Sequence, residues 1–529
     1  MTIADSKSPA LGSRRGNAGL QARQLSALTS LAVVALSFWN LFVLGGTHTD
    51  VSWLLTVGEK VLAGERLYVD VWETNPPFSV LLYLPMAWLG QVTPVPAEVW
   101  TKLATVAWAG GFGAFALALA GRLGLLAPRE RLVVLPVGLY VLLLFMPATF
   151  SQREHFGVAS ALPMLVLAAW RMSADAARPV GAASVAAAGL GAAVTMIVKP
   201  HYALAFLLPY LAAAWSRRSL RVLFGPEVLV AAAATVAYGV FVWAAYPEYL
   251  SGIVPLLLDV YLARQPMIDL VFLLDWMQIL LGGILVFLMA TLAGRRDNPL
   301  VWSFAAAALG FYCAYLAMGK GWIYHAMPAL ALTVLAIGVV AARCWAAAER
   351  QPAGRVPAGR IFRVFVLAAG LAGAQTFASW QRFAAPPGLV ERLRQVVANP
   401  AVAVVSANIG AGHPMARLVN GRWIERTCSD WIVLGRYELG NDPEVDAATR
   451  NRIEAHVADA MARKVEAWTA TPPDIVFLDA KPTVGGQIVA SDPNFAAIYA
   501  DYAVVFESAT MRVALRSGLL PAWQAAFGG

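Results

Sequence analysis

The chain has 529 residues, of which 59% are hydrophobic and only 14% are charged, and its mean hydropathy is +0.62. Soluble domains are about 45–50% apolar and about 25% charged, so the composition excludes an ordinary soluble enzyme and indicates a polytopic membrane protein. The net charge of +8 does not indicate a nucleic-acid partner, because the basic residues lie in short loops between apolar blocks, where they report membrane orientation.

Apolar blocks of about 20 residues, the length that a bilayer-spanning helix needs, recur along residues 28–380. Residues 1–27 are polar, and the block after them lacks a small-residue cleavage site, which predicts a retained span behind a cytoplasmic tail. We expect eleven transmembrane helices, at 28–46, 98–121, 132–148, 158–170, 180–198, 203–215, 228–246, 270–293, 300–318, 326–342 and 364–380. The predicted fold class is a polytopic α-helical membrane protein with a C-terminal soluble α/β domain.

The basic residues divide the loops into two sides. With the N-terminus in the cytoplasm, every predicted inner loop is basic; these loops contain Arg122, Arg129, Arg131, Arg171, Arg178, Arg217, Arg218, Arg221, Arg295, Arg296, Arg343, Arg350, Arg355, Arg360 and Arg363. This positive-inside bias sets the orientation of the chain. After an odd number of spans, the C-terminal domain is expected in the periplasm or outside the cell. The predicted location is a bacterial inner membrane.

The first outer loop, residues 47–97, contains two short apolar stretches at 51–62 and 77–89. Each is shorter than the roughly 17 residues needed to cross a bilayer, so we expect interfacial helices on the outer surface. The stretch at 253–262 has a similar composition and receives the same interpretation.

The composition changes after the last predicted span, and residues 381–529 resemble a soluble domain of ordinary size. We expect strands at 402–407, 474–479 and 502–507 and a helix at 446–468. We interpret this external domain as an acceptor-recognition or scaffold module. Its Cys428 has no cysteine or histidine nearby in sequence that indicates a disulfide or a metal cluster.

Ionisable residues gather at the predicted outer ends of the spans, whereas the span centres are nearly uncharged. They are acids, cations and histidines, most of them beside an aromatic residue or a proline: His48, Asp50, Asp70, Glu73, Arg153, Glu154, His155, Lys199, His201, Lys320 and His325. Ionisable groups in membrane segments are costly and mark functional sites. The pattern therefore predicts one polar site at the outer mouth of the helical region.

These residues also have structural interpretations. Lys199 and Lys320 are followed by aromatic residues, and lysines at span ends commonly reach lipid headgroups. Asp50 is also explained as a water-exposed acid at a helix end, and Glu73 as an acid in the turn before a proline. The run Arg153-Glu154-His155 is also explained as a local ion pair that caps a helix.

The first outer loop contains three short motifs: Gly45-Gly-Thr-His-Thr-Asp50, Gly64-Glu-Arg-Leu-Tyr68-Val-Asp70 and Trp72-Glu73-Thr-Asn-Pro76-Pro77. This run resembles the GT-C superfamily of membrane glycosyltransferases, especially bacterial relatives of protein O-mannosyltransferases and of the lipid A aminoarabinose transferase. Those enzymes have a catalytic aspartate shortly after the first span, then a glycine-and-tyrosine segment and a short acidic segment that ends in proline. The resemblance implies a GT-C-like membrane region with interfacial helices and an external C-terminal domain.

The resemblance also implies the reaction, which is inverting transfer of a sugar from a polyprenyl-phosphate donor to a hydroxyl group of a cell-envelope glycan, lipid or protein. Asp50 is the expected general base, because an attacking hydroxyl must lose its proton, and Glu73 and Glu154 are the other predicted catalytic residues. Cations stabilise the charge that develops on the departing phosphate. The predicted donor phosphate-binding residues are Arg153, Lys199 and Lys320. The predicted substrate-binding residues are Tyr68, Asp70, His155, His201, Tyr324 and His325.

Two departures from the family pattern concern the acids. Many relatives have two adjacent acids at the catalytic place, whereas Asp50 lies between a threonine and a valine, so a paired role needs an acid such as Glu154 from elsewhere. The Asp-x-Asp form of the second acidic motif is absent, which leaves a divalent metal ion as an open alternative. Glu73 and His325 are the residues considered for it, although two ligands specify no metal.

Absent motifs narrow the field further. The chain has no phosphate-binding loop, dinucleotide fingerprint, HExxH or Gly-x-Ser-x-Gly motif, which argues against a nucleotide-driven or serine-hydrolase mechanism. Two other functions stay open. A transporter or flippase of a lipid-linked sugar predicts polar residues near the middle of the membrane, and a non-catalytic envelope scaffold predicts that Asp50→Asn has no effect.

Overall fold

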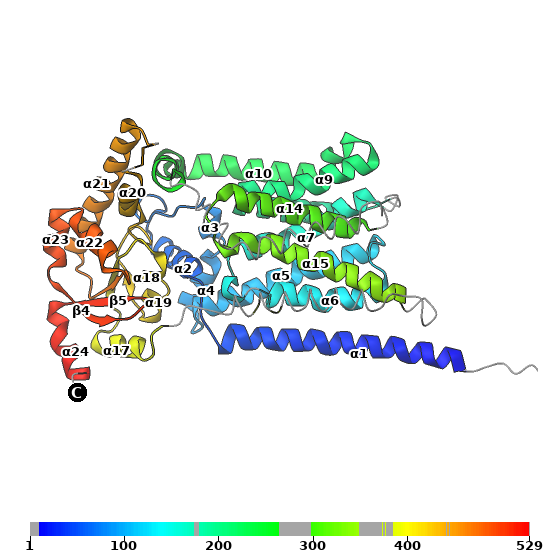
Figure 1. Ribbon diagram of the computed structural model, residues 1–529, viewed down its shortest axis with the longest axis horizontal. Coiled ribbons are helices and arrows are strands. Elements are labelled where there is room, and N and C mark those ends of the chain that lie inside the picture. Colours follow the sequence, from blue (N-terminus) through cyan, green and yellow to red (C-terminus); the bar gives the residue numbers. More distant parts are fainter. Residues whose placement is uncertain are drawn as a thin grey trace, which may run out of the picture. The chain divides into compact units, whose positions relative to one another are not determined.

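The computed structural model describes residues 10–145, 147–173, 179–263, 298–348, 373, 376, 385–440, 442–443 and 445–527. The chain forms two compact units (Figure 1). The first, called the helical unit, comprises Met1–Gly45, Thr105–Thr235 and Ile268–Gln381. The second, called the mixed unit, comprises Gly46–Ala104, Val236–Met267 and Arg382–Gly529.

Apolar helices make up the described part of the helical unit. They are α1 (Ala10–Phe38), α6 (Pro128–Leu143), α7 (Arg153–Met172), α8 (Ala182–Val198), α9 (Leu204–Arg217), α14 (Pro299–Met318) and α15 (Ile323–Ala348), with most of α5 (Ala97–Arg122) and the first half of α10 (Pro226–Ala245). A short 3₁₀ turn, Pro200–Ala203, joins α8 to α9.

Six helices in the described part of the chain are long and apolar enough to cross a membrane: Leu20–Val43, Ala97–Arg122, Arg153–Met172, Pro226–Ala245, Pro299–Met318 and Ile323–Ala346. The expected spans that correspond to α6, α8 and α9 are also helical but shorter. The expected spans at 270–293 and 364–380 lie wholly or largely outside the described residues. The helical, multi-pass architecture is therefore confirmed, whereas the count of eleven is not.

Helix α7 lies at the centre of the helical unit, in contact with α8, α9, α14 and α15. The approach of α8 to α7 is close because Gly191 has no side chain, and a Cβ atom there would collide with the Ser160 carbonyl oxygen. Thr195 Oγ1 on α8 donates a hydrogen bond of 2.8 Å to the carbonyl oxygen of Gly157 on α7. These contacts fix the end of α8 beside the beginning of α7.

The mixed unit begins with residues 46–104, where both stretches expected to form interfacial helices are helical; their position at a membrane surface stays a prediction. The helices are α2 (Thr49–Leu62), α3 (Phe78–Leu81) and α4 (Leu84–Val92). The expected stretch at 253–262 is also helical and includes α11 (Val254–Leu256) within the apolar segment Tyr249–Leu262. A compact unit that contains these segments is larger than the predicted domain of residues 381–529.

The C-terminal part of the mixed unit, called the sheet region, has a five-stranded sheet in the order β2-β1-β3-β5-β4. The strands are β1 (Ala401–Val405), β2 (Arg422–Trp423), β3 (Ile475–Leu478), β4 (Tyr502–Glu507) and β5 (Arg512–Arg516). β1 pairs in parallel with β2 and β3, whereas β5 pairs antiparallel with β3 and β4. Every residue of β1 and β3 is buried, as the continuous apolar runs of central strands require.

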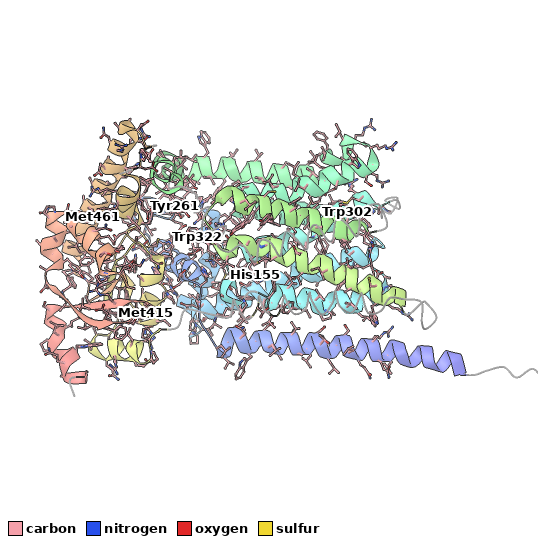
Figure 2. The ribbon with its side chains drawn as sticks, viewed as in Figure 1. His155, Tyr261, Trp302, Trp322, Met415 and Met461 are labelled. Carbon is pink, nitrogen blue, oxygen red and sulfur yellow. The ribbon has the colours of Figure 1, made fainter. Side chains whose placement is uncertain are left out.

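Helices surround this sheet: α17 (Leu389–Val396), α18 (Ile409–Gly412), α19 (Met415–Leu418), α20 (Trp431–Leu439), α21 (Ala447–Ala470), α22 (Pro482–Ala490), α23 (Pro493–Tyr499) and α24 (Leu520–Phe527). Met461 of α21 is 1% exposed and belongs to the core of the sheet region (Figure 2). The expected strands correspond to β1, β3 and β4, and the expected helix corresponds to α21. β2, with two residues, and β5, with an arginine at each end, were not expected.

A buried charged network joins the sheet to α21. Lys464 Nζ lies 2.6 Å from the carbonyl oxygen of Val404 and 2.9 Å from Asp430 Oδ1, and it also contacts Glu425 Oε1. Asp430 Oδ2 accepts a hydrogen bond from the backbone N–H of Ser406. Burial raises the pKa of Asp430 to about 7, although the charge of Lys464 acts in the opposite direction.

We expect Asp430 to make the stability of the mixed unit depend on pH. Because its pKa is higher in the folded chain than the value of about 3.9 in an unfolded one, the folded state binds the proton more tightly. The free energy of unfolding should therefore fall as the pH rises from about 4 to about 7. Asp430→Asn should flatten this fall in thermal unfolding followed in detergent at several pH values. Asp492→Asn is the control, since asparagine still caps α23; an unchanged slope in Asp430→Asn contradicts the assignment.

Candidate functional site

The predicted site residues fall into two groups, one in each unit. The cationic group, in the helical unit, contains Arg153, Glu154, His155, Lys199, His201, Lys320, Tyr324 and His325. The acidic group, in the mixed unit, contains Asp50, Tyr68, Asp70 and Glu73. The convergence of both groups on one pocket stays a prediction.

Three helix ends position the cationic group. Arg153 and Glu154 are the first residues of α7, Lys199 directly follows α8, and Tyr324 and His325 lie in the first turn of α15. Since α7 contacts both α8 and α15, residues that are remote in sequence come together at the start of α7. The expected grouping of these side chains is thus present within the helical unit.

Glu154 is the centre of the cationic group. Its Oε1 atom lies 2.6 Å from Lys199 Nζ and 4.0 Å from His325 Nε2, and its side chain is 0% exposed. A carboxylate buried this completely requires a counter-charge, which Lys199 supplies. Lys199 Nζ also lies 5.4 Å from the ring centroid of Tyr324 and 5.8 Å from that of Tyr202, within the range of cation–π interaction.

Positive charge exceeds negative charge in this group. Arg153 and Lys320 are buried as well as Lys199, so three of the predicted residues in this group are buried cations and one, Glu154, is a buried carboxylate. Lys320 lies in the turn between α14 and α15, where the flanking residues Gly319 and Gly321 have φ angles of 59° and 67°, a backbone conformation that glycine adopts easily. A buried excess of cations suits an anionic ligand such as a phosphate.

Two buried polar atoms beside Glu154 have no hydrogen-bond partner among the described residues, namely the Tyr202 hydroxyl and His325 Nδ1. Buried polar atoms without a partner are uncommon in proteins and call for an explanation such as a bound ligand or water. His201 is close enough for the charges of Lys199 and Glu154 to act on it. The group therefore offers both positive charge and free hydrogen-bonding atoms.

His155 makes a different contact. Its Nε2 atom lies 2.7 Å from the carbonyl oxygen of Leu142 at the end of α6, and its ring packs edge-on against Phe150. This contact ties α7 to α6, so His155 has a structural role, and its part in substrate binding stays a prediction. The indole of Trp322 packs against Tyr324 and His325, at 5.7 and 5.4 Å between ring centroids.

Asp50 is the second residue of α2. The imidazole of His48 caps this helix, because its Nδ1 atom accepts a hydrogen bond of 3.2 Å from the backbone N–H of Asp50. A carboxylate in the first turn is stabilised by the partial positive charge of the helix N-terminus. The helix thus fixes the backbone of Asp50 while its side chain stays half-buried.

Glu73 is buried and held by several donors. Trp53 Nε1 donates a hydrogen bond of 2.6 Å to Glu73 Oε2, while the backbone N–H of Asn75 donates one of 3.0 Å to Oε1. The hydroxyl of Thr74 donates a further hydrogen bond of 3.3 Å to Glu73 Oε1. The carboxylate therefore closes the turn before the two prolines and connects this turn to α2 through Trp53.

The thiol of Cys428, in the sheet region, is near both acids. Burial and then the charge of Glu73 raise the pKa of this thiol well above its ordinary value, and the charge of Asp50 acts in the same direction. The two carboxylates thus lie within electrostatic range of one half-buried thiol. Sequence analysis did not predict that Cys428 lies near these acids. A single cysteine far from the other motifs has no spacing pattern that indicates a site.

Tyr68 and Asp70 support the same loop. Tyr68, which has a φ of 70°, donates a hydrogen bond of 2.6 Å from its hydroxyl to the carbonyl oxygen of Asn75, and its ring packs against Tyr249 at 4.8 Å between centroids. Asp70 Oδ2 accepts a hydrogen bond of 2.8 Å from the backbone N–H of Arg66. These contacts hold the turn of Glu73 in place, and binding of substrate by either residue stays a prediction.

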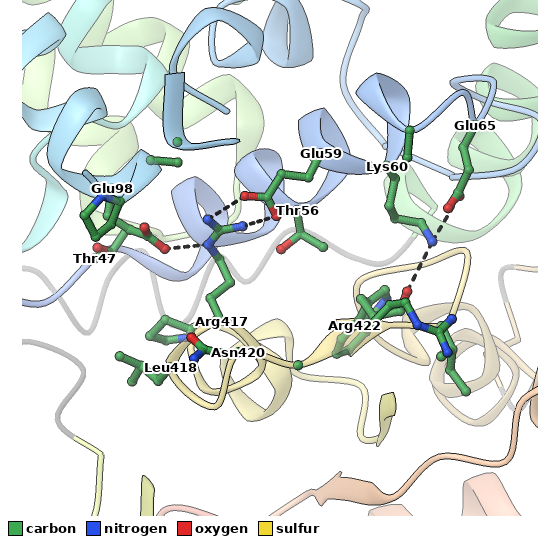
Figure 3. Close-up of a pocket in the computed structure, with 18 of the residues that line it drawn as sticks. Thr47, Thr56, Glu59, Lys60, Glu65, Glu98, Arg417, Leu418, Asn420 and Arg422 are labelled. Atoms are coloured by element: carbon green, nitrogen blue, oxygen red, sulfur yellow. Dashed lines mark hydrogen bonds and ion pairs between the residues drawn. The ribbon is translucent and has the colours of Figure 1, made fainter. Parts of the chain in front are cut away.

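A pocket of 1070 Å³ opens within the mixed unit (Figure 3). Residues of α2, the start of α5, α19, β2 and the end of α21 line it, and Asp70 is at its edge. Its walls carry charges of both signs, including Glu59, Glu98 and Arg417. No sequence pattern predicts this pocket, since its walls come from three segments that are distant along the chain.

The two residues considered as ligands of a divalent metal ion belong to different units. Glu73 is in the mixed unit and His325 is in the helical unit. Among the residues that the structure describes, no group of three or more His, Cys, Asp or Glu side chains is placed to hold a metal ion. A metal role for that pair stays a prediction.

Comparison with known proteins places the fold. No protein-family model matches the chain, and no curated protein sequence matches it. The crystal structure of ArnT from Cupriavidus metallidurans bound to undecaprenyl phosphate is similar, with a TM-score of 0.51 and 14% sequence identity over 93% of this chain and 97% of that chain. The apo structure of the same ArnT gives a TM-score of 0.52 and 14% identity over 92% and 98% of the two chains. The chain therefore has the fold of ArnT over most of its length.

Proposed function

We propose that the chain is a GT-C-type glycosyltransferase that moves a sugar from a polyprenyl-phosphate donor to a hydroxyl group of a cell-envelope acceptor. The observation that carries the proposal is the buried ion pair of Lys199 and Glu154 at the start of α7, with the further buried cations Arg153 and Lys320 in the same unit, in a chain with the ArnT fold. One of the similar ArnT structures is bound to undecaprenyl phosphate. A lipid phosphate of that kind is the leaving group that such a donor would release.

The cationic group supports departure of the lipid phosphate. As the bond between the anomeric carbon and the phosphate oxygen breaks, the electron pair goes to that oxygen and its negative charge grows. Lys199, Arg153 and Lys320 bind this charge, and donors placed in a dry site act more strongly than they do in water. Glu154 holds Lys199 in position at 2.6 Å. The Tyr202 hydroxyl and His325 Nδ1 supply further hydrogen bonds to the donor.

The acidic group supports attack by the acceptor. The acceptor hydroxyl attacks the anomeric carbon from the face opposite to the leaving phosphate, which inverts the configuration, and its proton passes to the Asp50 carboxylate. Glu73 positions the loop behind this base, because Trp53 links its carboxylate to α2. In this mechanism Asp50 and the cationic group face the two sides of one sugar.

The location proposed for this reaction is the outer face of a bacterial inner membrane. The basic inner loops support a cytoplasmic N-terminus, and in the proposed orientation the start of α7 and the sheet region are on the periplasmic side. There, a polyprenyl tail remains in the bilayer while its phosphate reaches the cationic group. The acceptor is a glycan, a lipid or a protein of the cell envelope, and the sheet region is the proposed module for its recognition.

The test is a donor assay on the purified chain in detergent. Polyprenyl phosphates that carry different sugars are supplied together with a cell-envelope extract as the acceptor source, and released polyprenyl phosphate is measured by mass spectrometry. We expect release with at least one sugar, and only when the extract is present. No release with any donor, combined with movement of a labelled lipid-linked sugar across reconstituted vesicles, would contradict a transferase and support a transporter.

A further inference from the structure

The position of Asp50 depends on how α2 is held, because Asp50 lies in the first turn of this helix. Glu59 lies on the same helix near its other end. A helix of 14 residues moves as a rigid rod, so a contact that fixes Glu59 also limits the movement of Asp50. The contacts of Glu59 therefore bear on the geometry of the base.

Glu59 is held by Arg417 of α19, which lies in the 1070 Å³ pocket (Figure 3). Arg417 Nη1 donates a hydrogen bond of 2.6 Å to Glu59 Oε2, and Nη2 donates one of 2.8 Å to Oε1, so each terminal guanidinium nitrogen binds one carboxylate oxygen. Arg417 Nε lies 2.5 Å from Glu98 Oε1 in the first turn of α5. One arginine of the sheet region thus binds α2 and the start of α5; we call this contact the Arg417 clamp.

The charge of Arg417 is maintained in this pocket. Burial alone acts against the charged form, but the charges of Glu98 and Glu59 hold the pKa of Arg417 above its ordinary value. A planar fork with several N–H donors matches a carboxylate in a way that a lysine ammonium does not. The geometry of α2 is therefore set by a rigid, charged contact.

Two more contacts connect α2 to the same segment of the sheet region. The indole of Trp53 packs against the rings of His413 and Trp423, with centroids 5.3 and 6.1 Å apart. Lys60 Nζ donates a hydrogen bond of 3.2 Å to the carbonyl oxygen of Trp423. Segment 413–423 consequently holds the N-terminal half of α2 through packing and its C-terminal half through charge.

From this arrangement we infer that Arg417 is a positioning residue, which orients α2 and, through it, the Asp50 carboxylate. The inference rests on the proposed function for the role of Asp50, but the restraint on α2 is a property of the structure alone. A small misplacement of a catalytic group lowers the reaction rate and leaves the affinity for the donor unchanged. A shift of about 1 Å lowers the rate roughly 10²-fold. Loss of the Arg417 clamp should therefore lower kcat and leave the donor KM nearly unchanged.

The experiment compares Arg417→Gln and Arg417→Lys with a control, Arg452→Gln. Arg452 also binds a carboxylate of the mixed unit, that of Asp259, with hydrogen bonds of 3.0 and 3.1 Å, and among the described residues its hydrogen-bond partners are Asp259 and Thr449, neither of which belongs to α2. We expect kcat for lipid-phosphate release to fall about 10–100-fold in Arg417→Gln, with an intermediate fall in Arg417→Lys and a value near wild type in Arg452→Gln. The donor KM should stay within about threefold in all of them.

Hydrogen exchange of residues 49–62, followed by mass spectrometry, tests the restraint without any substrate. Exchange there should rise about tenfold or more in Arg417→Gln and stay unchanged in Arg452→Gln. If exchange in α2 is unaffected, or if kcat of the folded variant equals that of wild type, the inference is overturned. A wild type that releases no lipid phosphate refutes the proposed function instead, and the exchange result still decides the restraint. If Arg417→Gln does not fold, Glu59→Gln opens the same clamp from α2 and takes its place.

Discussion

Asp50→Asn is expected to lower kcat for lipid-phosphate release by about 10²–10⁴-fold, the contribution that a general base makes to catalysis. Asparagine has the shape of aspartate but cannot accept the proton of the attacking hydroxyl. Its backbone N–H still donates to His48 Nδ1, so α2 should begin as it does in the wild type. The donor KM should change little, because the lipid phosphate is bound by the cationic group. Initial rates at several donor concentrations measure both quantities.

The matched control is Asp492→Asn, which makes the same change of carboxylate to amide at the N-cap of α23, away from the acidic group. Its kcat should equal that of the wild type. Equal turnover in Asp50→Asn and wild type would remove Asp50 as the base. Such a result, in a chain that still releases lipid phosphate, would direct attention to Glu73 or Glu154.

Lys199→Met is expected to have the second large effect, on stability as well as activity. It leaves the fully buried carboxylate of Glu154 without the ammonium that lies 2.6 Å away. Removal of one partner from a buried ion pair costs about 3–5 kcal/mol, so the midpoint of thermal unfolding should fall clearly. Loss of a group that stabilises the developing charge lowers kcat by about 10²–10³-fold.

A double variant separates these two effects. Lys199→Met combined with Glu154→Gln removes both charges, and neutral replacement of a buried ion pair is often tolerated. We expect the double variant to recover most of the thermal stability and none of the activity. If activity returns together with stability, Lys199 acts only in packing, and its role in binding the donor phosphate is wrong.

The sequence predicted the helical framework because its signals are local. Long apolar blocks bounded by arginines mark the spans, and an aspartate placed just after the first span marks the start of α2. Even the meeting of Glu154, Lys199 and His325 was foreseen as a group, since each residue lies at a predicted outer helix end and helix ends on one side of a membrane share one layer. The specific contact of Lys199 with Glu154 required the register between α7 and α8, which Gly191 and Thr195 fix through packing that no pattern reveals.

Other parts of the site depend on contacts between distant segments. Arg417 is one of many arginines in residues 381–529, and no motif distinguishes it. Its partner Glu59 has the spacing of an ordinary surface residue on an amphipathic helix. Trp53 similarly looks like an interfacial aromatic, although its indole N–H binds Glu73. β2 was not predicted, because two residues are too few to show the alternation of apolar and polar side chains that marks a strand. Such features come from tertiary structure, which overrides local preference.

The most direct test of the account is a structure of the chain with undecaprenyl phosphate bound. We predict that the phosphate lies within ion-pair distance of Lys199, with Arg153 or Lys320 as a second cation, and that the Asp50 carboxylate faces the same cavity. A phosphate bound away from the start of α7, or an Asp50 side chain that opens onto a different surface, would contradict the proposed transferase site.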